Sequence, residues 1–315
     1  MAEFHPSDLI KSMKPEAFRV HAPTTVVFLC GGVIDSSLAA PVMLRDAFYR
    51  VCKNSAPDFS VVLAEDALPL TAEAGYRDLF SFESDIAQIV GLILLFAESP
   101  GSLAELGAFA ALKTVAPSLL AVLDDYYYGA VSFIRNGPIR FLENEYGEEW
   151  ILVLDRSEVG ISPTGTIEAL NTSAFAANIL PAVKKRLESR SAWSRLDRNN
   201  SGHAILFMTG LCQEFGALTI GELKAYLEKF EIESGRLQNF IYCAQLLGWI
   251  QKVRKGNHIF YVAAPGEPAL DYKLEGGTRD KVRWRSDIRA FWQKHDPARL
   301  KAITAVLSPP SGGAA

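Results

Sequence analysis

The chain has 315 residues, 49% of them hydrophobic, and a formal net charge of −4. This composition is typical of a globular protein with more than one domain, and it excludes a disordered chain. The longest apolar stretch, residues 86–97, is interrupted by Gln88 and is shorter than the roughly 20 residues that a membrane-spanning helix needs, so we expect no membrane segment.

Cysteine and histidine residues show no metal-binding pattern. The four cysteines form no CxxC pair, and the five histidines lack a spacing that would bind zinc. The first 16 residues also lack the apolar block of a signal peptide. We therefore expect reduced thiols, a cytoplasmic location and no metal site.

Short apolar runs alternate with helical stretches over the first half of the chain. This alternation predicts an α/β domain with a parallel sheet and helices on both faces, placed here at residues 1–190. The predicted strands cover 24–30, 59–64, 91–96, 119–123 and 150–154. The first predicted helix begins at Ser36 or Ser37 and ends at Tyr49, and three others cover 71–90, 102–114 and 166–187.

The pattern changes after a polar linker at 191–203. Helices are predicted at 204–214, 220–228 and 235–250, and a hairpin follows over 251–262. Three helices and a hairpin in this order predict a winged helix-turn-helix domain at 204–265.

Residues 266–315 form a predicted basic tail. Within it, residues 278–301 carry eight Lys or Arg and three Asp, a charge of +5, so the rest of the chain carries −9. An acidic body with a basic tail indicates a polyanionic partner.

Candidate nucleic-acid-binding residues lie in the third predicted helix of the winged domain, in the hairpin and in the tail. The arginines of the tail are interleaved with Trp284 and Trp292, a combination typical of proteins that contact phosphates and stack on single-stranded bases. The alternative is a solvated helix with its tryptophans in the core. The candidates are Arg236, Lys252, Arg254, Lys255, Arg279, Arg283, Arg285 and Arg289.

The segment 94–110 contains the candidate catalytic residue. A strand leads into Ser-Pro-Gly-Ser and a helix opens there, and in parallel sheets ligands bind at the carboxyl ends of strands. Glu105 would face that crevice, where a carboxylate can stabilise or attack the positive sugar carbon that forms as an N-glycosidic bond breaks. The alternative is structural, with Ser102 as helix N-cap and Glu105 completing a capping box.

The segment Gly101–Gly107 resembles the Gly-Thr-x-x-Glu-Leu-Gly motif of nucleoside 2-deoxyribosyltransferases. In that family the glutamate is the nucleophile, so the resemblance implies this role for Glu105. The family usually has an aspartate two residues before the motif glycine, where this sequence has Ser99 with Glu98 beside it. Glu98 either replaces the missing carboxylate or is a solvated loop acid.

Further substrate-binding candidates follow the first two strands. Gly31 and Gly32 could cradle a phosphate and Asp35 could hold ribose hydroxyls, with a plain turn as the alternative. Glu65, after the second strand, is more typical of a solvated acid. The full set of substrate-binding candidates is Gly31, Gly32, Asp35, Glu98, Ser99, Gly101 and Ser102.

The two-domain organisation is similar to that of retron-encoded toxins of the nucleoside deoxyribosyltransferase-like type. This resemblance implies an anti-phage effector that is inhibited by a reverse transcriptase and its multicopy single-stranded DNA. It also implies NAD⁺ as the substrate, with no further cofactor. Nicotinamide leaves NAD⁺ as a neutral molecule and needs no general acid, which suits a site with one clear carboxylate.

The aromatic run Tyr126–Tyr128 and the apolar residues up to Phe133 indicate a homodimer or larger assembly, although one tyrosine could instead stack on a base. Two other functions stay open. One is a ligand-sensing winged-helix transcription regulator with a degenerate nucleotide pocket. The other is a nucleotide phosphoribohydrolase of the lysine-decarboxylase-like type, whose Pro-Gly-Gly-x-Gly-Thr motif is partly matched at Pro100–Ser102.

Overall fold

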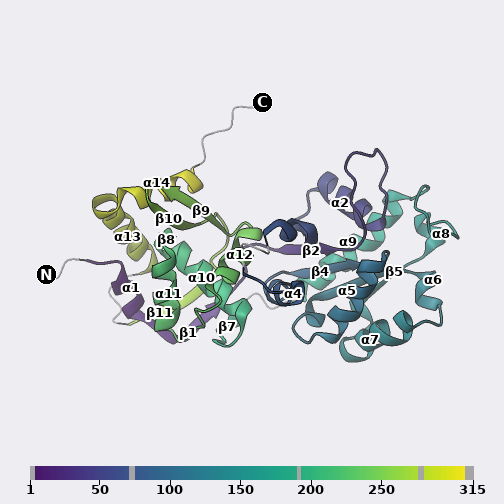
Figure 1. Ribbon diagram of the computed structural model, residues 1–315, viewed down its shortest axis with the longest axis horizontal. Helices are drawn as coiled ribbons and strands as arrows, with labels where there is room; N and C mark the ends of the chain where they lie inside the picture. The colour runs from purple at the N-terminus through teal and green to yellow at the C-terminus, as the bar shows by residue number, and fades with distance from the viewer. Residues whose placement is uncertain (1–3, 71–74, 190–192, 276–279, 309–315) are drawn as a thin grey trace. The chain divides into compact units, whose positions relative to one another are not determined.

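The chain divides into two compact units, seen in a computed structural model that describes residues 4–70, 75–189, 193–275 and 280–308 (Figure 1). The α/β unit comprises residues 25–69 and 78–190. The C-terminal unit comprises residues 1–24, 70–77 and 191–315.

These boundaries differ from the expected ones, because the first 24 residues belong with the C-terminal unit. Strand β1, Met13–Val20, pairs antiparallel with β11, Leu270–Leu274, and with β7, Ser194–Arg195. The predicted linker therefore includes a paired strand, and the predicted tail begins with another.

The α/β unit contains a five-stranded parallel sheet flanked by helices, as the sequence predicts. The strand order is β3-β2-β4-β5-β6, so the order reverses between β2 and β4, and ligands bind at such switch points. All residues of β2, β4 and β5 are buried, as in a sheet covered on both faces. The strands are β2, Val26–Cys30; β3, Ser60–Leu63; β4, Leu92–Phe96; β5, Leu119–Asp124; and β6, Ile151–Leu154.

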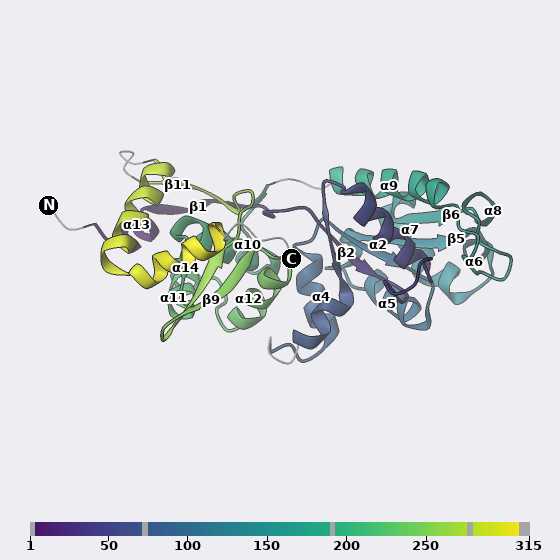
Figure 2. The same ribbon diagram turned by 90° about the horizontal axis from the view of Figure 1, so that it is seen from above.

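Four helices cover the two faces of this sheet (Figure 2). Helices α2, Leu44–Ser55, and α9, Thr172–Glu188, pack on one face, and α4, Leu79–Ala87, and α5, Pro100–Ala111, lie on the other. The connections include η1, Ala64–Leu70; η2, Ala116–Ser118; α6, Asp125–Gly129; η3, Arg135–Ile139; α7, Arg140–Tyr146; η4, Glu148–Trp150; and α8, Arg156–Val159.

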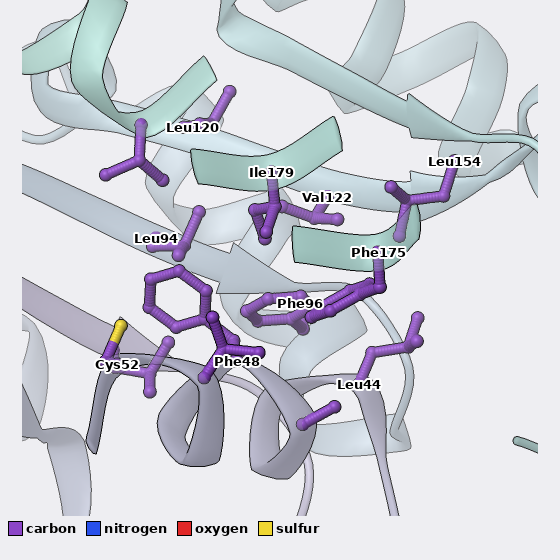
Figure 3. Packing of buried hydrophobic residues seen from close by; sticks show 14 of the residues in the cluster. Leu44, Phe48, Cys52, Leu94, Phe96, Leu120, Val122, Leu154, Phe175 and Ile179 are labelled. Carbon is purple, nitrogen blue, oxygen red and sulfur yellow. The ribbon is translucent and has the colours of Figure 1, made fainter. Parts of the chain in front are cut away.

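A hydrophobic core lies between the sheet and helices α2 and α9 (Figure 3). The ring of Phe96 on β4 lies 5.9 Å from that of Phe48 on α2 and 6.5 Å from that of Phe175 on α9. Burying one such side chain contributes about 1.5–3 kcal/mol, so these contacts fix both helices on the sheet.

The prediction of a helix starting at Ser36 or Ser37 is wrong, because α2 begins at Leu44. Pro41 disfavours helical backbone at the residue before it. The side chain of Asp35 accepts hydrogen bonds from Ser37 and stabilises a turn instead. Residues 33–43 therefore form a loop, called here the 33–43 loop.

The C-terminal unit contains three helices and a hairpin at nearly the predicted positions. The hairpin turns at Gly256, whose φ of +59° suits glycine. The hairpin consists of β9 and β10, and β10 also pairs with the short strand β8, Ala217–Leu218. The three strands form a sheet of order β8-β10-β9. The elements are α10, Ser201–Phe215; α11, Ile220–Lys229; α12, Leu237–Leu246; β9, Ile250–Lys255; and β10, His258–Ala263.

The C-terminal segment packs as part of this unit. It forms α13, Lys281–His295, and α14, Pro297–Leu307, while α1, Ser7–Ser12, lies near the start of the chain. Trp284 and Trp292 on α13 are buried, which bears out the alternative that the tryptophans belong to the core. In the part of the chain that the structure describes, no helix is both long and apolar enough to cross a membrane.

Candidate active site

The turn from β4 into α5 places the motif glutamate. Ser99 is the N-cap, Pro100 occupies the first helical position, and Ser102 completes a reciprocal capping box with Ser99. The structural alternative in which Ser102 is the N-cap and Glu105 its capping partner is wrong. Glu105 lies in the second turn of α5, so its carboxylate is left available for another role.

One carboxylate oxygen of Glu105, Oε2, is buried and has no hydrogen-bond partner among the described residues. Burial raises the pKa of the Glu105 carboxyl; the charge of Arg45 lowers it and that of Glu65 raises it. A buried polar atom without a partner is costly, so natural proteins rarely keep one without a reason.

Glu105 lines a cavity of about 440 Å³ at the carboxyl ends of β2 and β3, called here the Glu105 cavity. Backbone of the turn after β2, two further acids and one arginine form its polar walls, with Phe82 and Leu79 on an apolar side. The lining residues are Gly31, Gly32, Val33, Ile34, Met43, Arg45, Ala64, Glu65, Leu79, Phe82, Glu83, Ser99 and Glu105.

Arg45 is the buried cation of this cavity. Its guanidinium donates to the carbonyl oxygens of Gly32 at 2.8 Å and Leu29 at 2.9 Å, and it forms an ion pair with Glu65. It therefore fixes the turn after β2 and offsets the acidity of the cavity. Arg45 lies on α2, and no motif in that part of the sequence indicates a site. Glu65 is not merely a solvated acid, because it lines the cavity.

Glu83 on α4 is the third carboxyl of the Glu105 cavity. Its side chain is buried, and burial together with the charge of Glu105 raises its pKa to about 8. Glu83 therefore holds a proton at neutral pH. Sequence analysis missed it because nothing in the pattern of α4 distinguishes it from a surface acid.

Replacing Glu83 by Gln is expected to stabilise the protein more at about pH 8 than at about pH 5. Folded Glu83 keeps its proton up to about pH 8, whereas the unfolded carboxyl loses it near 4.5. Stability is therefore lost between these values as pH rises, by up to about 1.4 kcal/mol per pH unit, and the Gln variant avoids this loss. Urea denaturation at several pH values measures the difference; a difference independent of pH would contradict it. The exposed Glu188→Gln is the control.

Glu98 does not line the Glu105 cavity, so it does not replace the family's aspartate there, and it is not a solvated acid either. It accepts hydrogen bonds from the backbone N–H groups of Leu44 at 2.7 Å, Arg45 at 3.0 Å and Gly32 at 3.4 Å. Burial raises its pKa, and these bonds oppose that shift. Glu98 therefore ties both ends of the 33–43 loop to the end of β4.

The glycine candidates differ in their surroundings. Gly31 has a φ of +143°, and a Cβ there would lie 2.9 Å from Cβ of Phe96. Gly31 therefore requires glycine. At Gly32 a Cβ would lie 2.0 Å from the Met43 sulfur, so a larger residue there would have to displace that side chain. Gly101 is exposed at the start of α5 and does not line the Glu105 cavity.

The polar candidates are used mainly for local structure. Asp35 is engaged by Ser37 and does not line the Glu105 cavity. The Ser102 hydroxyl is buried and bonded within the β4–α5 turn, whereas Ser99 lines the cavity. Among the described residues, no group of three or more His, Cys, Asp or Glu is arranged to hold a metal ion.

The nucleic-acid candidates are spread over the C-terminal unit. Lys252 and Arg254 are exposed on β9 with Lys255 partly so, and Arg283 and Arg289 are exposed on α13. The Arg236 guanidinium lies 5.7 Å from the ring of Phe240. Arg279 lies outside the described residues.

Arg285 is engaged in an ion pair within the unit. Its guanidinium donates to both oxygens of Glu214 on α10, at 2.5 and 2.9 Å, and Tyr272 on β11 donates to the same carboxylate at 2.8 Å. The Glu214 side chain is buried, so this cluster joins α10, β11 and α13. The guanidinium of Arg285 is therefore used to hold α13 against α10, and not primarily to contact nucleic acid.

A family model described as STM3845 retron effector protein matches residues 41–252, which is more than half of the chain. The chain belongs to the STM3845 retron effector family. This membership confirms the resemblance to retron effectors. The matched range includes Arg45, Glu83 and Glu105 and continues into the C-terminal unit.

Two proteins of Escherichia coli are similar to this family member. One, named "Retron Ec86 putative ribosyltransferase/DNA-binding protein", is 28% identical over 160 residues, which cover 50% of each chain. The other, named "Retron Ec73 putative ribosyltransferase/DNA-binding protein", is 25% identical over 304 residues, which cover 91% of each chain. The match thus spans about half the length of the Ec86 protein and most of the Ec73 protein.

Proposed function

We propose that this retron effector is an anti-phage N-glycosidase that cleaves the nicotinamide–ribose bond of NAD⁺ or of a related nucleotide. The observation that carries the proposal is Glu105, which lines a cavity at the switch point of a parallel sheet and has one buried carboxylate oxygen without a hydrogen-bond partner among the described residues. The ribosyltransferase names of the two relatives support the same class of bond.

Glu105 acts on the sugar. As the bond between nicotinamide and ribose breaks, positive charge develops on the anomeric carbon, and the Glu105 carboxylate stabilises it or forms a covalent bond to it. Water then supplies a hydroxyl group to that carbon and releases a proton. The reaction converts NAD⁺ and water into nicotinamide, ADP-ribose and a proton.

Arg45 and Glu83 set the charge of this site. Three ionised acids in one small cavity would repel one another, and the protonated Glu83 together with the Arg45–Glu65 ion pair leaves Glu105 as the carboxylate that meets the substrate. Glu83 also offers a proton to a leaving group that needs one. Deoxynucleosides therefore form the second candidate substrate class, and an assay with NAD⁺ beside deoxyadenosine separates the two.

We propose that the C-terminal unit is a winged helix-turn-helix domain that binds nucleic acid or a nucleic-acid-bearing partner. Its order of α10, α11, α12 and the β9–β10 hairpin supports this, as do the DNA-binding names of both relatives. In this account the retron reverse transcriptase and its multicopy single-stranded DNA hold the enzyme inactive until it is released.

Replacing Arg283 and Arg289 together by Ala is expected to weaken binding of single-stranded DNA and to flatten its salt dependence. Each lost phosphate contact lowers the slope of log affinity against log salt by about 0.7, so two contacts lower it by about 1.4. Fluorescence anisotropy over a salt series measures the slope, with Lys184→Ala on α9 as the control. An unchanged slope would show that these arginines do not contact phosphates.

We also propose that the protein works as a homodimer or a larger assembly. Val131 is 98% exposed and Phe133 is 84% exposed, and Tyr126 and Phe141 are exposed in the same region of sequence. Such apolar exposure is typical of an interaction site. Phe133→Glu is expected to lower the mass measured by light scattering, whereas Val282→Glu on α13 leaves it unchanged. A wild-type protein that is already monomeric at micromolar concentration would contradict this proposal.

A further inference from the structure

A second cavity, of about 620 Å³, lies beside the Glu105 cavity in the α/β unit. It is bounded by part of the 33–43 loop, the ends of β4 and β5, and residues 164–168. Met43 lines both cavities, and the consecutive residues Glu98 and Ser99 line this cavity and the Glu105 cavity respectively. The two cavities are therefore neighbours at the same edge of the sheet.

The lining of the second cavity suits a neutral ligand that carries hydroxyl groups. No lysine or arginine lines it in the described chain, and the guanidinium of Arg156, which contacts the lining residues Asp124 and Tyr127, is already paired with the Asp124 carboxylate. Glu98 is used by three backbone amides, and Asp124 is paired with Arg156 at 2.9 Å. The hydroxyl groups of Thr164 and Thr166 each share one hydrogen bond with the Ser162 hydroxyl, at 2.8 and 2.9 Å, and a hydroxyl group can make more than one such bond. The carboxylate of the exposed Glu168 also lines the cavity.

The same cavity has an aromatic wall. Tyr127 lines it and is 47% exposed as a residue, and its ring packs edge-on against that of Tyr126 at a centroid distance of 5.4 Å. The remaining walls are mainly aliphatic. An exposed ring above an aliphatic pocket with hydroxyl groups at one side is the chemistry that recognises a base and its ribose.

The walls of the cavity are held in place before any ligand binds. Arg156 joins Asp124 to the carbonyl oxygen of Pro163 at 3.0 Å. Arg50 donates to the carbonyl oxygens of Leu38 and Ala39, each at 3.0 Å, and so fixes the loop on the other side. A preformed cavity loses little ordering entropy when it binds a ligand.

We propose that this second cavity binds a nucleoside moiety, with its base against Tyr127 and its ribose hydroxyls near Thr166 and Glu168. The nucleoside is either the far half of a dinucleotide whose scissile half occupies the Glu105 cavity, or a free nucleoside. The first of these sources rests on the proposed function, whereas binding of the nucleoside itself does not.

Titration calorimetry of the full chain with adenosine tests this inference. The wild-type protein is expected to bind adenosine, and Ala40→Trp, which fills the cavity, is expected to abolish binding. Ser36→Trp is the matched control, because Ser36 is exposed on the same loop and lines neither cavity. Tyr127→Ala is expected to weaken binding by about tenfold or more, the cost of one lost stack on a base. It serves as the second variant if Ala40→Trp does not fold.

Kinetics distinguish the two sources of the nucleoside. If the cavity holds the far half of NAD⁺, Ala40→Trp raises KM for NAD⁺ and leaves cleavage of nicotinamide riboside unchanged. If it holds a free nucleoside, adenosine binding is lost but both KM values stay the same. Absence of adenosine binding to wild type at millimolar concentration, or equal binding by a folded Ala40→Trp, would overturn the inference. Failure to cleave NAD⁺ would instead count only against the proposed function.

Discussion

Replacing Glu105 by Gln is expected to lower the rate of N-glycosidic cleavage by about a hundredfold or more, the usual cost of losing a key electrostatic group. Gln keeps the size of the side chain but lacks the charge that meets the developing positive carbon. Because burial raises the pKa of Glu105, its ionisation costs stability at neutral pH. The Gln variant should therefore melt at the wild-type temperature or above it.

Initial rates of nicotinamide release and thermal melting curves measure both effects on the purified protein. Glu188→Gln is the matched control, because Glu188 is an exposed acid on α9, with a side-chain exposure of 66%. The same substitution there should change neither rate nor melting temperature. A folded Glu105→Gln variant that cleaves at the wild-type rate would show that Glu105 is not the catalytic carboxylate.

Replacing Arg285 by Ala is expected to destabilise the C-terminal unit by about 2 kcal/mol. The substitution leaves the Glu214 carboxylate buried, at 2% exposure, without its cation. Breaking a fully buried pair costs about 3–5 kcal/mol, but the Arg285 side chain is 44% exposed, so solvent reduces the loss. The denaturation midpoint of the unit measures the change.

Arg283→Ala is the matched control for Arg285→Ala, because Arg283 is an exposed arginine on the same helix. It should leave the midpoint nearly unchanged and alter only the salt dependence of nucleic-acid binding. Equal stability of the two variants would show that the Glu214 cluster does not hold α13 in place, and it would return Arg285 to the set of nucleic-acid candidates.

The parallel sheet could be predicted from the sequence because its strands are short, apolar runs separated by helices. Every residue of Leu92–Phe96 is apolar and buried. An unbroken apolar run is the sequence pattern of a strand that is covered on both faces. The start of α2 could not be predicted so well. Serine residues at 36 and 37 look like caps, but Pro41 and the hydrogen bonds of Asp35 favour a loop.

The pairing of β1 with β11 lay beyond sequence analysis, since the two strands are separated by most of the chain. A short local window contains no signal for such a partner. The same limit explains why the basic segment was expected to be a separate tail. Its charge is visible in the sequence, but the contact of Arg285 with Glu214 depends on the folded arrangement of α10 and α13.

Only part of the Glu105 cavity could be predicted. Glu105 is found through its motif, and Gly31 and Gly32 through their place after the first strand. Arg45 and Glu83 were missed, because a residue's burial inside a cavity leaves no local pattern in the sequence. The hydrogen bonds of Glu98 to the backbone likewise appear only in the folded chain.

Incubating the purified chain with NAD⁺ and quantifying the products by mass spectrometry shows whether the protein is an N-glycosidase. We expect nicotinamide and ADP-ribose to be released in equal amounts, and both products to form more slowly with Glu105→Gln, by about a hundredfold or more. The absence of glycosidic cleavage of NAD⁺, related nucleotides or deoxyadenosine by the wild-type chain freed of its retron partners would contradict it.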